Sequence, residues 1–311
     1  GPAGSAGMRH EPDIARGAAE DDLRRVRHRR LELDGHGVFY REAGPPDAPV
    51  LLLPHGYPCS SFEFRNYMPA LADRWRLLAP DFPGSGLTDD PPGFQHDFSG
   101  YAHFLGRFAD ALGVKRFALY LHDFGTWIGL RLALQRSDQV AALIIQNGDI
   151  YEDALGPKYK GLLETLALPE AQQREAFSKA VSEEEFRVEF LNDVRPDLAE
   201  RIPPDLWKLH AGFVTPARRE ILVRVLMGWK ANVDWFPRYQ AWLRERRPPT
   251  LIIWGPQDGY MPEASARAYL RDLPDAELHL LDGGHWLLET NLDEAVALTR
   301  NFLTRAFPAA P

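Results

Sequence analysis

Three side chains that lie far apart in the chain could together carry out nucleophilic catalysis: Asp123, Asp258 and His285. A free aspartate has a pKa of about 3.9, so Asp123 needs no base to become a nucleophile. A carboxylate is suited to attack a saturated carbon that bears a leaving group, which gives an alkyl ester. His285 could then activate the water that hydrolyses this ester, while Asp258 orients the imidazole.

Such residues need a scaffold that brings the ends of several strands together. Short apolar runs alternate with helical stretches at the spacing of βαβ units, which predicts an α/β fold with a mainly parallel sheet flanked by helices. The predicted strands are 31–33, 38–41, 50–53, 76–80, 117–121, 142–145, 251–254 and 277–281. The predicted helices are 61–71, 101–112, 127–135, 263–273 and 292–302. Ligands bind at the carboxyl ends of strands in such sheets, and all three candidate side chains follow predicted strands.

The alternation stops between residues 151 and 247, where the chain is helical, charged and rich in tryptophan. A helical insertion between strands is interpreted as a lid over one end of the sheet. We therefore divide the chain into a lead-in at 1–28, an α/β core at 29–150 and 248–311, and a helical cap at 151–247. The first seven residues, which precede Met8, are interpreted as the remnant of an expression tag.

The loops after the strands resemble those of the α/β-hydrolases, in the branch of the epoxide hydrolases and haloalkane dehalogenases. The matching segments are His55-Gly56-Tyr57-Pro58, Asp81-Phe82-Pro83-Gly84-Ser85-Gly86, His122-Asp123-Phe124-Gly125, Trp254-Gly255-x-x-Asp258 and Gly284-His285. The order of nucleophile, acid and base along the chain is also that of the α/β-hydrolases. The resemblance covers residues 31–307 and implies an α/β-hydrolase fold with a helical cap.

The resemblance also implies a role for each residue. Asp123 would be the nucleophile at a strand-to-helix elbow, Asp258 the acid and His285 the base. The backbone N–H groups of Tyr57 and Phe124 would form the oxyanion hole. Losing one such donor in a comparable site costs about 3–4 kcal/mol.

Each assignment competes with a simpler role. Asp123 could instead cap the following helix, and Asp149 could replace the predicted acid. His55 is placed among the substrate-binding residues, although it could instead hold its own loop by hydrogen bonds. His122 is expected to shape the elbow and not to act as a base.

The reaction depends on what stabilises the leaving group. Phe124 stands where dehalogenases of this family commonly place a tryptophan, and it has no donor. Epoxide hydrolases supply a tyrosine from the cap, and Tyr239 is predicted to protonate the departing oxygen, with Tyr151 and Tyr159 as the remaining candidates. Tyr159 and Trp229 are predicted to contact the substrate.

The match departs from the family at two positions. Leu121 stands two residues before Asp123, where the family has glycine, which predicts a less tight elbow. The family commonly has tyrosine near Trp229, so its usual tyrosine pair is expected to be incomplete. An indole N–H donates one hydrogen bond but is not an acid near neutral pH.

Composition narrows the remaining classes of function. Lys plus Arg is 36 and Asp plus Glu is 44, and a net charge of −8 argues against broad binding of nucleic acid. Cys59 is the single cysteine, so it forms no internal bridge and no cysteine-based zinc site. We predict no cofactor and no metal. No apolar run is long enough to span a membrane and no signal peptide follows Met8, so the predicted location is cytoplasmic.

Taken together, the sequence predicts an epoxide hydrolase that converts a small apolar or aromatic substrate to a diol. A haloalkane dehalogenase is the runner-up. A non-hydrolytic ligand-binding or cyclisation protein on the same fold comes third. A homodimer is compatible with the sequence.

Overall fold

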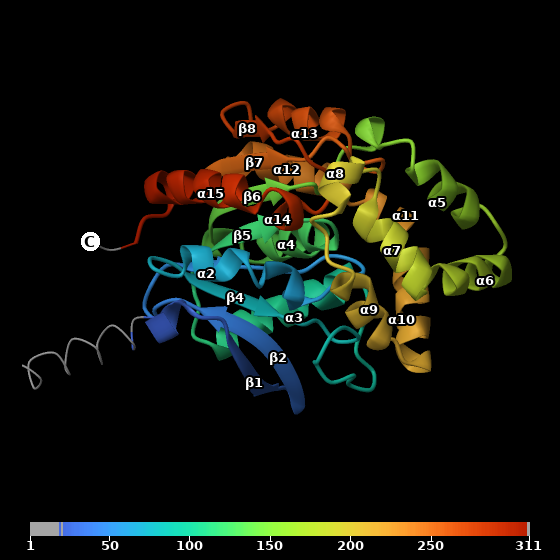
Figure 1. Ribbon diagram of the computed structural model, residues 1–311, viewed down its shortest axis with the longest axis horizontal. Coiled ribbons are helices and arrows are strands. Elements are labelled where there is room, and N and C mark those ends of the chain that lie inside the picture. Colours follow the sequence, from blue (N-terminus) through green and yellow to red (C-terminus); the bar gives the residue numbers. More distant parts are fainter. Residues whose placement is uncertain (1–18, 20, 310–311) are drawn as a thin grey trace, which may run out of the picture.

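The computed structural model describes residues 19 and 21–309, and its centre is one eight-stranded sheet (Figure 1). The seven residues before Met8 lie outside the described residues. The strands are β1 (Arg27–Leu33), β2 (His36–Ala43), β3 (Val50–Leu52), β4 (Arg76–Pro80), β5 (Phe117–Leu121), β6 (Val140–Gln146), β7 (Thr250–Trp254) and β8 (Glu277–Leu280). Their spatial order is β1-β2-β4-β3-β5-β6-β7-β8.

The sheet is mainly parallel, as the alternation of strands and helices predicted. β2 runs antiparallel to both β1 and β4, and the strands that follow in space from β4 to β8 are parallel to one another. Asp34 and Gly35 connect β1 to β2 with φ angles of 51° and 84°, which suits a two-residue hairpin turn. β1 begins at Arg27, four residues before the start of the first predicted strand at 31–33.

Helices cover both faces of the sheet. They are α2 (Tyr67–Leu71), α3 (Phe98–Ala111), α4 (Phe124–Gln135), α13 (Glu263–Ala268), α14 (Leu287–Thr290) and α15 (Leu292–Ala306). Successive side chains of a strand point to opposite faces, so Leu51 packs in one core with α2 and α15, while Leu52 packs in the other with α3 and α4.

The predicted helix at 61–71 is two shorter elements. A 3₁₀ helix at Ser61–Phe64 is followed by α2, which begins at Tyr67. Pro69 explains the break, because a proline in the interior of a continuous helix lacks the N–H for its hydrogen bond and clashes with the carbonyl four residues earlier.

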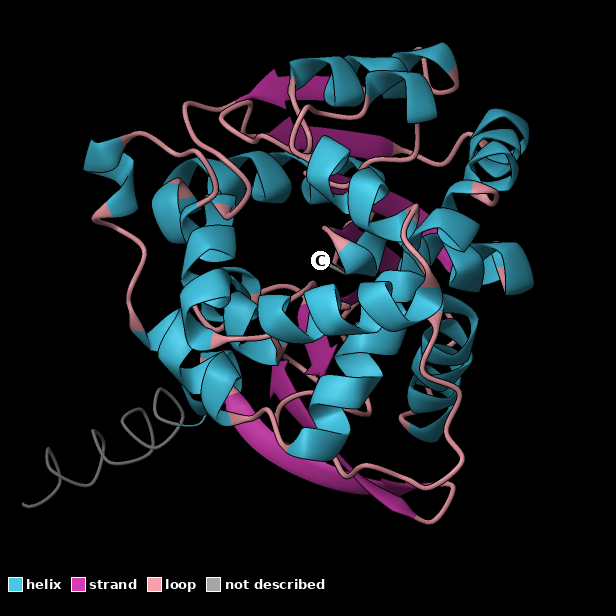
Figure 2. Ribbon diagram, turned by 90° about the vertical axis from the view of Figure 1, so that its right-hand side faces the viewer, coloured by secondary structure: helices cyan, strands magenta, loops and turns pink. Residues whose placement is uncertain are grey.

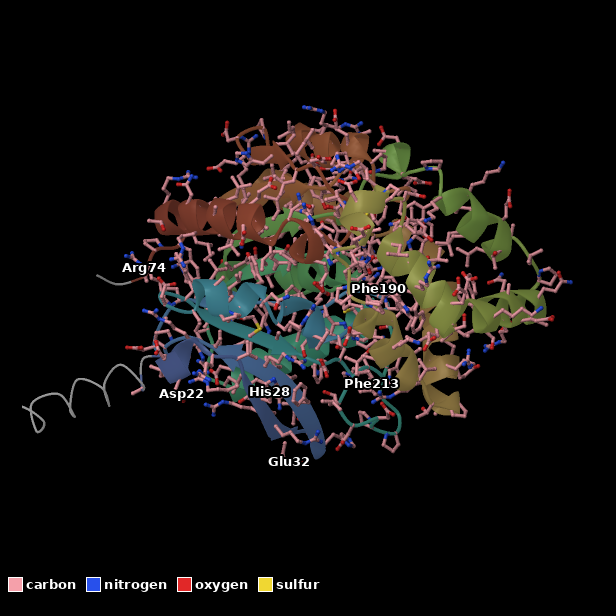
Figure 3. The ribbon with its side chains drawn as sticks, viewed as in Figure 1. Asp22, His28, Glu32, Arg74, Phe190 and Phe213 are labelled. Atoms are coloured by element: carbon pink, nitrogen blue, oxygen red, sulfur yellow. The ribbon has the colours of Figure 1, made fainter. Side chains whose placement is uncertain are left out.

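Residues 147–249, all of which are described, contain helices and no strand. The helices are α5 (Tyr159–Leu166), α6 (Glu170–Ala180), α7 (Glu183–Leu191), α8 (Pro196–Ala199), α9 (Asp205–Gly212), α10 (Pro216–Met227), α11 (Trp229–Val233) and α12 (Phe236–Arg246). We call residues 151–247 the helical insertion. Figure 2 faces these helices, and Figure 3 places Phe190 and Phe213 among them, to the right of Arg74 in that view. Among the described residues, no helix combines the length and apolarity needed to cross a membrane.

Candidate active site

Asp123 lies at a tight turn between β5 and α4. Its φ of 53° and ψ of −132° are strained for a residue with a side chain, and such strain is found at functional sites. The expectation that Leu121 would loosen this turn is wrong. A Cβ at Gly129 would lie 2.4 Å from Leu121 Cδ2, so the glycine on α4 leaves room for the leucine.

One oxygen of Asp123 is held by main-chain donors. The backbone N–H groups of Tyr57 and Phe124 both donate to Oδ2 at 2.7 Å. A Cβ at position 56 would lie 2.6 Å from the Asp123 Cβ, so only glycine lets this loop come close enough. The two N–H groups predicted as an oxyanion hole therefore converge on one oxygen of the predicted nucleophile.

The other oxygen of Asp123 faces an imidazole. His285 Nε2 lies 2.9 Å from Asp123 Oδ1, and His285 Nδ1 lies 2.6 Å from Asp258 Oδ2. The Asp123 side chain is 13% exposed, whereas that of Asp258 is fully buried. The structure therefore joins the three predicted residues in one hydrogen-bonded chain, and its open end is the strained aspartate.

Asp258 is held by four donors besides the imidazole. They are the backbone N–H groups of Tyr260 and Met261 and the side-chain amides of Asn147 and Asn192. Sequence reasoning missed both asparagines. Asn147 follows β6 with a φ of 44°, while Asn192 comes from the helical insertion. Five hydrogen bonds keep Asp258 ionised and fixed in orientation.

The charges of the three residues are coupled. Burial alone would raise the pKa of Asp123 and of Asp258, but the hydrogen bonds and charge of His285 outweigh burial and hold both below the usual value. Burial would lower the pKa of His285, but the two carboxylates raise it well above its usual value. The arrangement therefore favours an imidazolium between two carboxylates.

A buried pair behind the elbow connects three loops. Glu63 Oε2 lies 2.9 Å from His122 Nδ1, and Glu63 Oε1 accepts the N–H of Gly56 at 2.7 Å. His122 Nε2 donates to the carbonyl oxygen of His285 at 2.8 Å. His122 thus shapes the elbow region as predicted, but Glu63 was missed, because a glutamate beside a loop gives no signal in the sequence that it is buried.

A cavity of about 300 Å³ opens onto Asp123 and His285. Its apolar walls include Leu162, Phe177 and Leu226 from the helical insertion. Apolar walls around a few fixed polar groups are typical of sites for small molecules.

Two aromatic residues of the insertion line the same cavity. Tyr159 and Trp229 stack with their ring centroids 4.8 Å apart. The Trp229 indole N–H is buried and has no hydrogen-bond partner within the described part of the chain. Burial and nearby carboxylates raise the pKa of Tyr159 well above its usual value, so its hydroxyl keeps its proton. The structure therefore places both residues on the wall of the cavity that contains Asp123 and His285.

Comparison with known proteins identifies the family. A profile described as alpha/beta hydrolase fold matches residues 49–292. The chain belongs to the α/β-hydrolase fold family. Over 275 residues it is 30% identical to Uncharacterized hydrolase YNR064C of Saccharomyces cerevisiae, covering 85% of this chain and 92% of that protein. Over 269 residues it is 30% identical to Haloalkane dehalogenase 2 of Mycobacterium bovis, covering 84% and 89%.

A solved structure gives the same fold. The epoxide hydrolase CorEH superposes with a TM-score of 0.70 at 19% identity, covering 90% of this chain and 99% of that one. At this identity the likeness shows the fold alone. The family profile and the 30% identical haloalkane dehalogenase relative place this α/β-hydrolase in the branch of epoxide hydrolases and haloalkane dehalogenases.

Tyr239 does not line the cavity of this α/β-hydrolase, in contrast to the prediction. Its hydroxyl accepts from Arg131 Nε and donates to Asn232 Oδ1, both at 2.8 Å, and the side chain is fully buried. The tyrosine belongs to a packed polar network between α4 and α12. Tyr159 is therefore the tyrosine of the insertion that is available to a substrate.

The positions of Asp149 and His55 in the structure show what each side chain contacts. Asp149 does not contact the imidazole, because Asp258 occupies that place, and it bonds instead with the hydroxyl of Tyr159 at 3.3 Å. His55 uses both ring nitrogens locally. Its Nε2 accepts the N–H of Phe82 at 3.2 Å, and its Nδ1 lies 3.1 Å from the carbonyl oxygen of Gly56. It therefore holds its loop and does not line the cavity at Asp123.

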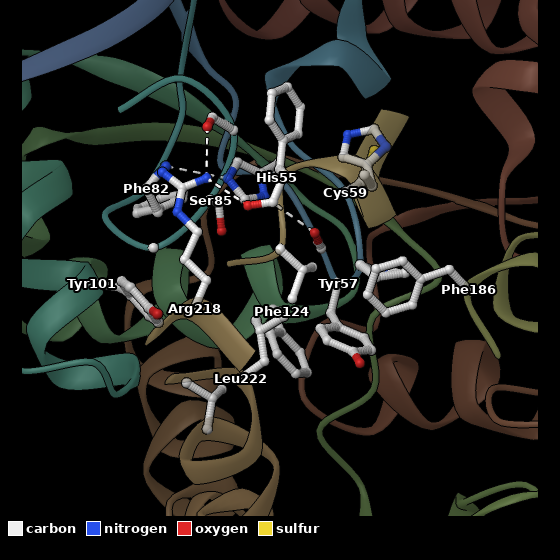
Figure 4. Close-up of a pocket in the computed structure, with 18 of the residues that line it drawn as sticks. His55, Tyr57, Cys59, Phe82, Ser85, Tyr101, Phe124, Phe186, Arg218 and Leu222 are labelled. Atoms are coloured by element: carbon white, nitrogen blue, oxygen red, sulfur yellow. Dashed lines mark hydrogen bonds between the residues drawn. The ribbon is translucent and has the colours of Figure 1, made fainter. Parts of the chain in front are cut away.

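A second, smaller cavity of about 60 Å³ is lined by residues 55–59, which form the loop after β3 that carries the Tyr57 N–H and is here called the oxyanion loop (Figure 4). His55 and Arg218 line it, and Arg218 is tied to the carbonyl oxygen of Gly86 at 2.8 Å. Tyr57 and Phe124 line both cavities, and their rings stack with centroids 5.3 Å apart. These two rings therefore lie between the smaller cavity and the cavity at Asp123 and His285, which we call the reacting cavity.

Proposed function

We propose that this α/β-hydrolase is an epoxide hydrolase that forms an alkyl ester on Asp123 and releases a diol. The observation that carries the proposal is that the two oxygens of the Asp123 carboxylate have different partners. Oδ2 accepts two backbone N–H groups, while Oδ1 lies 2.9 Å from His285 Nε2 beside an apolar cavity. We further propose that the helical insertion acts as a cap and that the substrate is a small apolar or aromatic epoxide.

In the first step Asp123 Oδ1 bonds to an epoxide carbon, and the bond from that carbon to the epoxide oxygen breaks. Tyr159 lies on the wall of the same cavity and gives its hydroxyl proton to the departing oxygen. Asp123 Oδ2 becomes the carbonyl oxygen of the ester and keeps its two backbone donors. General acid assistance of this kind contributes roughly 10²–10⁴ in rate.

The first step also switches His285. The charge of Asp123 contributes to the raised pKa of the imidazole, and esterification removes that charge. The pKa of His285 therefore falls, and its proton passes through solvent to the Tyr159 phenolate. A neutral imidazole, oriented by Asp258, is then ready to act as a base.

In the second step His285 takes a proton from water, and the hydroxide attacks Cγ of the ester. Negative charge develops on Oδ2, where the N–H groups of Tyr57 and Phe124 already point. The intermediate then expels the diol oxygen, which takes the proton of the newly formed carboxylic acid. Asp123 is left ionised beside a protonated His285, which restores the starting state.

The test is to trap the ester in a His285→Gln variant. Incubation with a panel of aryl and alkyl epoxides should give a protein whose mass rises by that of one epoxide, with the added mass on Asp123. An Asp123→Asn variant is the matched control and should give no adduct. If wild-type protein converts an epoxide to a diol and the His285→Gln variant never gains mass, the covalent route is wrong.

A hydrolytic dehalogenase is the second candidate, and the orphan N–H of Trp229 favours it. A buried donor without an acceptor that lines the reacting cavity suits a halide as well as an oxygen. The similarity to Haloalkane dehalogenase 2 supports the same candidate. Halide release from haloalkanes, with every epoxide of the panel left untouched, would replace the first proposal with this one.

A further inference from the structure

Asp149 is a buried carboxyl that the proposed reaction does not use directly. It follows β6, it is fully buried, and it reaches the reacting cavity only through the hydroxyl of Tyr159, 3.3 Å from its Oδ1. Its other oxygen, Oδ2, has no hydrogen-bond partner among the residues that the structure describes. The carboxyl therefore sits directly behind the tyrosine that faces the substrate.

The surroundings of Asp149 contrast with those of Asp258, which is buried to a similar depth. Asp258 accepts five hydrogen bonds, from donors that include an imidazole and two side-chain amides. The Asp149 carboxyl has only a phenol, which can either donate or accept. An ionised carboxylate is costly to bury without donors, whereas a neutral carboxyl needs only a partner for its own proton.

We propose that Asp149, in its neutral form, donates its proton in a hydrogen bond to the Tyr159 oxygen and so positions that tyrosine as the acid for the leaving oxygen. This inference rests on the proposed function, and it makes Asp149 a positioning residue. The Tyr159 oxygen accepts from the carboxyl, so its own O–H is free to point at the substrate. When that O–H bond breaks and the proton moves to the epoxide oxygen, the phenolate keeps a donor from Asp149.

Burial and two nearby carboxylates favour the neutral form of Asp149, whereas the hydrogen bond with Tyr159 acts in the opposite direction. Four charged and titratable groups surround the carboxyl. They are the carboxylate of Asp123 at the start of α4, the carboxylate of Asp258 after β7, the phenol of Tyr159 on α5 and the phenol of Tyr269 after α13. Burial, assisted by the two carboxylates, raises the pKa of Asp149 to about 8. Above that pH an ionised Asp149 would accept a hydrogen bond from the Tyr159 O–H, which turns this O–H away from the substrate, and its charge would oppose formation of the phenolate.

The experiment measures ester formation as a function of pH in the His285→Gln background, by quenched flow and mass spectrometry with an epoxide that the wild-type protein turns over. With Asp149 present, the rate should fall about tenfold per pH unit above roughly pH 8. In the Asp149→Asn variant the amide N–H can still donate to Tyr159 and does not titrate. This alkaline fall should then disappear or move up by more than one pH unit.

Asp272→Asn in the same background is the matched control. Asp272 is another buried aspartate bonded to a tyrosine hydroxyl, that of Tyr151, and it does not line the cavity. This variant should keep the alkaline fall. The same fall in the Asp149→Asn variant would overturn the inference and leave the proposed function standing, whereas absence of any ester at every pH would overturn both.

A second measurement covers the case in which the Asp149→Asn variant does not fold. The infrared spectrum of the wild-type protein should lose one protonated-carboxyl band between pH 7 and pH 9.5, and the Tyr159→Phe substitution should shift that band by removing the hydroxyl that accepts from the carboxyl. A wild-type spectrum with no such loss, or a band unmoved in Tyr159→Phe, would also overturn the inference.

Discussion

Glu63 and His122 lie 2.9 Å apart in a buried pair directly behind the elbow of Asp123. The pair connects the loop that carries one oxyanion donor to the loop that carries the base, because Glu63 accepts from Gly56 and His122 donates to the carbonyl oxygen of His285. Neither side chain lines the reacting cavity. The geometry of the reacting groups is therefore maintained from behind by residues that a substrate does not touch.

Removing the Glu63 carboxylate should make the protein easier to unfold and disturb the oxyanion loop. Glu63→Ala leaves the N–H of Gly56 and the Nδ1 of His122 without a partner, and breaking a buried pair in this way costs about 3–5 kcal/mol. Glu63→Gln is the matched control, since its oxygen can accept from Gly56 and its amide can donate to a neutral His122. Urea denaturation of the two variants measures the difference. Equal stability of the alanine and wild-type proteins would contradict the structural role.

Tyr159 should affect the rate of ester formation from epoxides, whereas Trp229 should affect that from haloalkanes. Tyr159→Phe removes the proton donor and should slow ester formation from epoxides by roughly 10²–10⁴, with a much smaller effect on haloalkanes, whose halide takes no proton. Trp229→Phe removes only an N–H donor and should act mainly on halide release. Single-turnover rates with one epoxide and one haloalkane measure both effects. A larger loss of epoxide opening in Trp229→Phe than in Tyr159→Phe would contradict the assignment of the acid.

Tyr239 should matter for stability and not for chemistry. Tyr239→Phe removes the hydroxyl that accepts from Arg131 and donates to Asn232, and leaving buried polar groups unsatisfied costs about 1–3 kcal/mol. Thermal unfolding should show the loss, while ester formation on Asp123 stays within a few-fold of wild type. A loss of ring opening comparable to that in Tyr159→Phe would restore the role first predicted for Tyr239.

The stability of the fold should fall in mild acid because of His210. Burial lowers its pKa to about 4, and its Nε2 lies 2.8 Å from the hydroxyl of Ser60, which suits a neutral ring. The unfolded chain binds this proton near pH 6.5, so the stabilisation is complete above that pH and is lost as the pH falls toward 4. The expected loss between pH 7 and pH 5 is about 2 kcal/mol.

The His210→Gln variant is the comparison for this pH dependence. A glutamine can bond to Ser60 and does not titrate, so its free energy of unfolding should change less between pH 7 and pH 5. Urea denaturation at both values measures the slope. An identical slope in the two proteins would show that His210 is not the group responsible.

The parts of the site that follow strands were predictable, and the parts that depend on how helices rotate were not. Asp123, Asp258 and His285 lie in the loops after β5, β7 and β8, and parallel strands bring their carboxyl ends to one edge of the sheet whatever the details of packing. Tyr239 lies on α12, whose orientation is set by contacts with Arg131 on α4, and no local pattern records that contact. Glu63 was missed for the same reason.

At the elbow of Asp123, a glycine at one position makes room for a larger side chain at another. Leu121 replaces the glycine expected two residues before Asp123, and Gly129 on α4 supplies the missing space one turn into the helix. Position-by-position comparison with a family pattern detects the departure at residue 121. It does not detect the compensation, because the two residues meet only after α4 packs on β5.

Gly56 packs closely against Asp123, and Gly125 packs closely against the main chain of Pro54. These two contacts affect which substitutions near the site the protein can accept. A Cβ at Gly125 would lie 2.3 Å from the carbonyl oxygen of Pro54, so the spacing of the two oxyanion donors is set where main chain meets main chain. The side chains of Tyr57 and Phe124 take no part in that spacing, although they form the wall between the two cavities. Variation at positions 57 and 124 can therefore merge or reshape the chambers, and so alter which molecules are accepted, while the charge-stabilising core of the reaction stays intact.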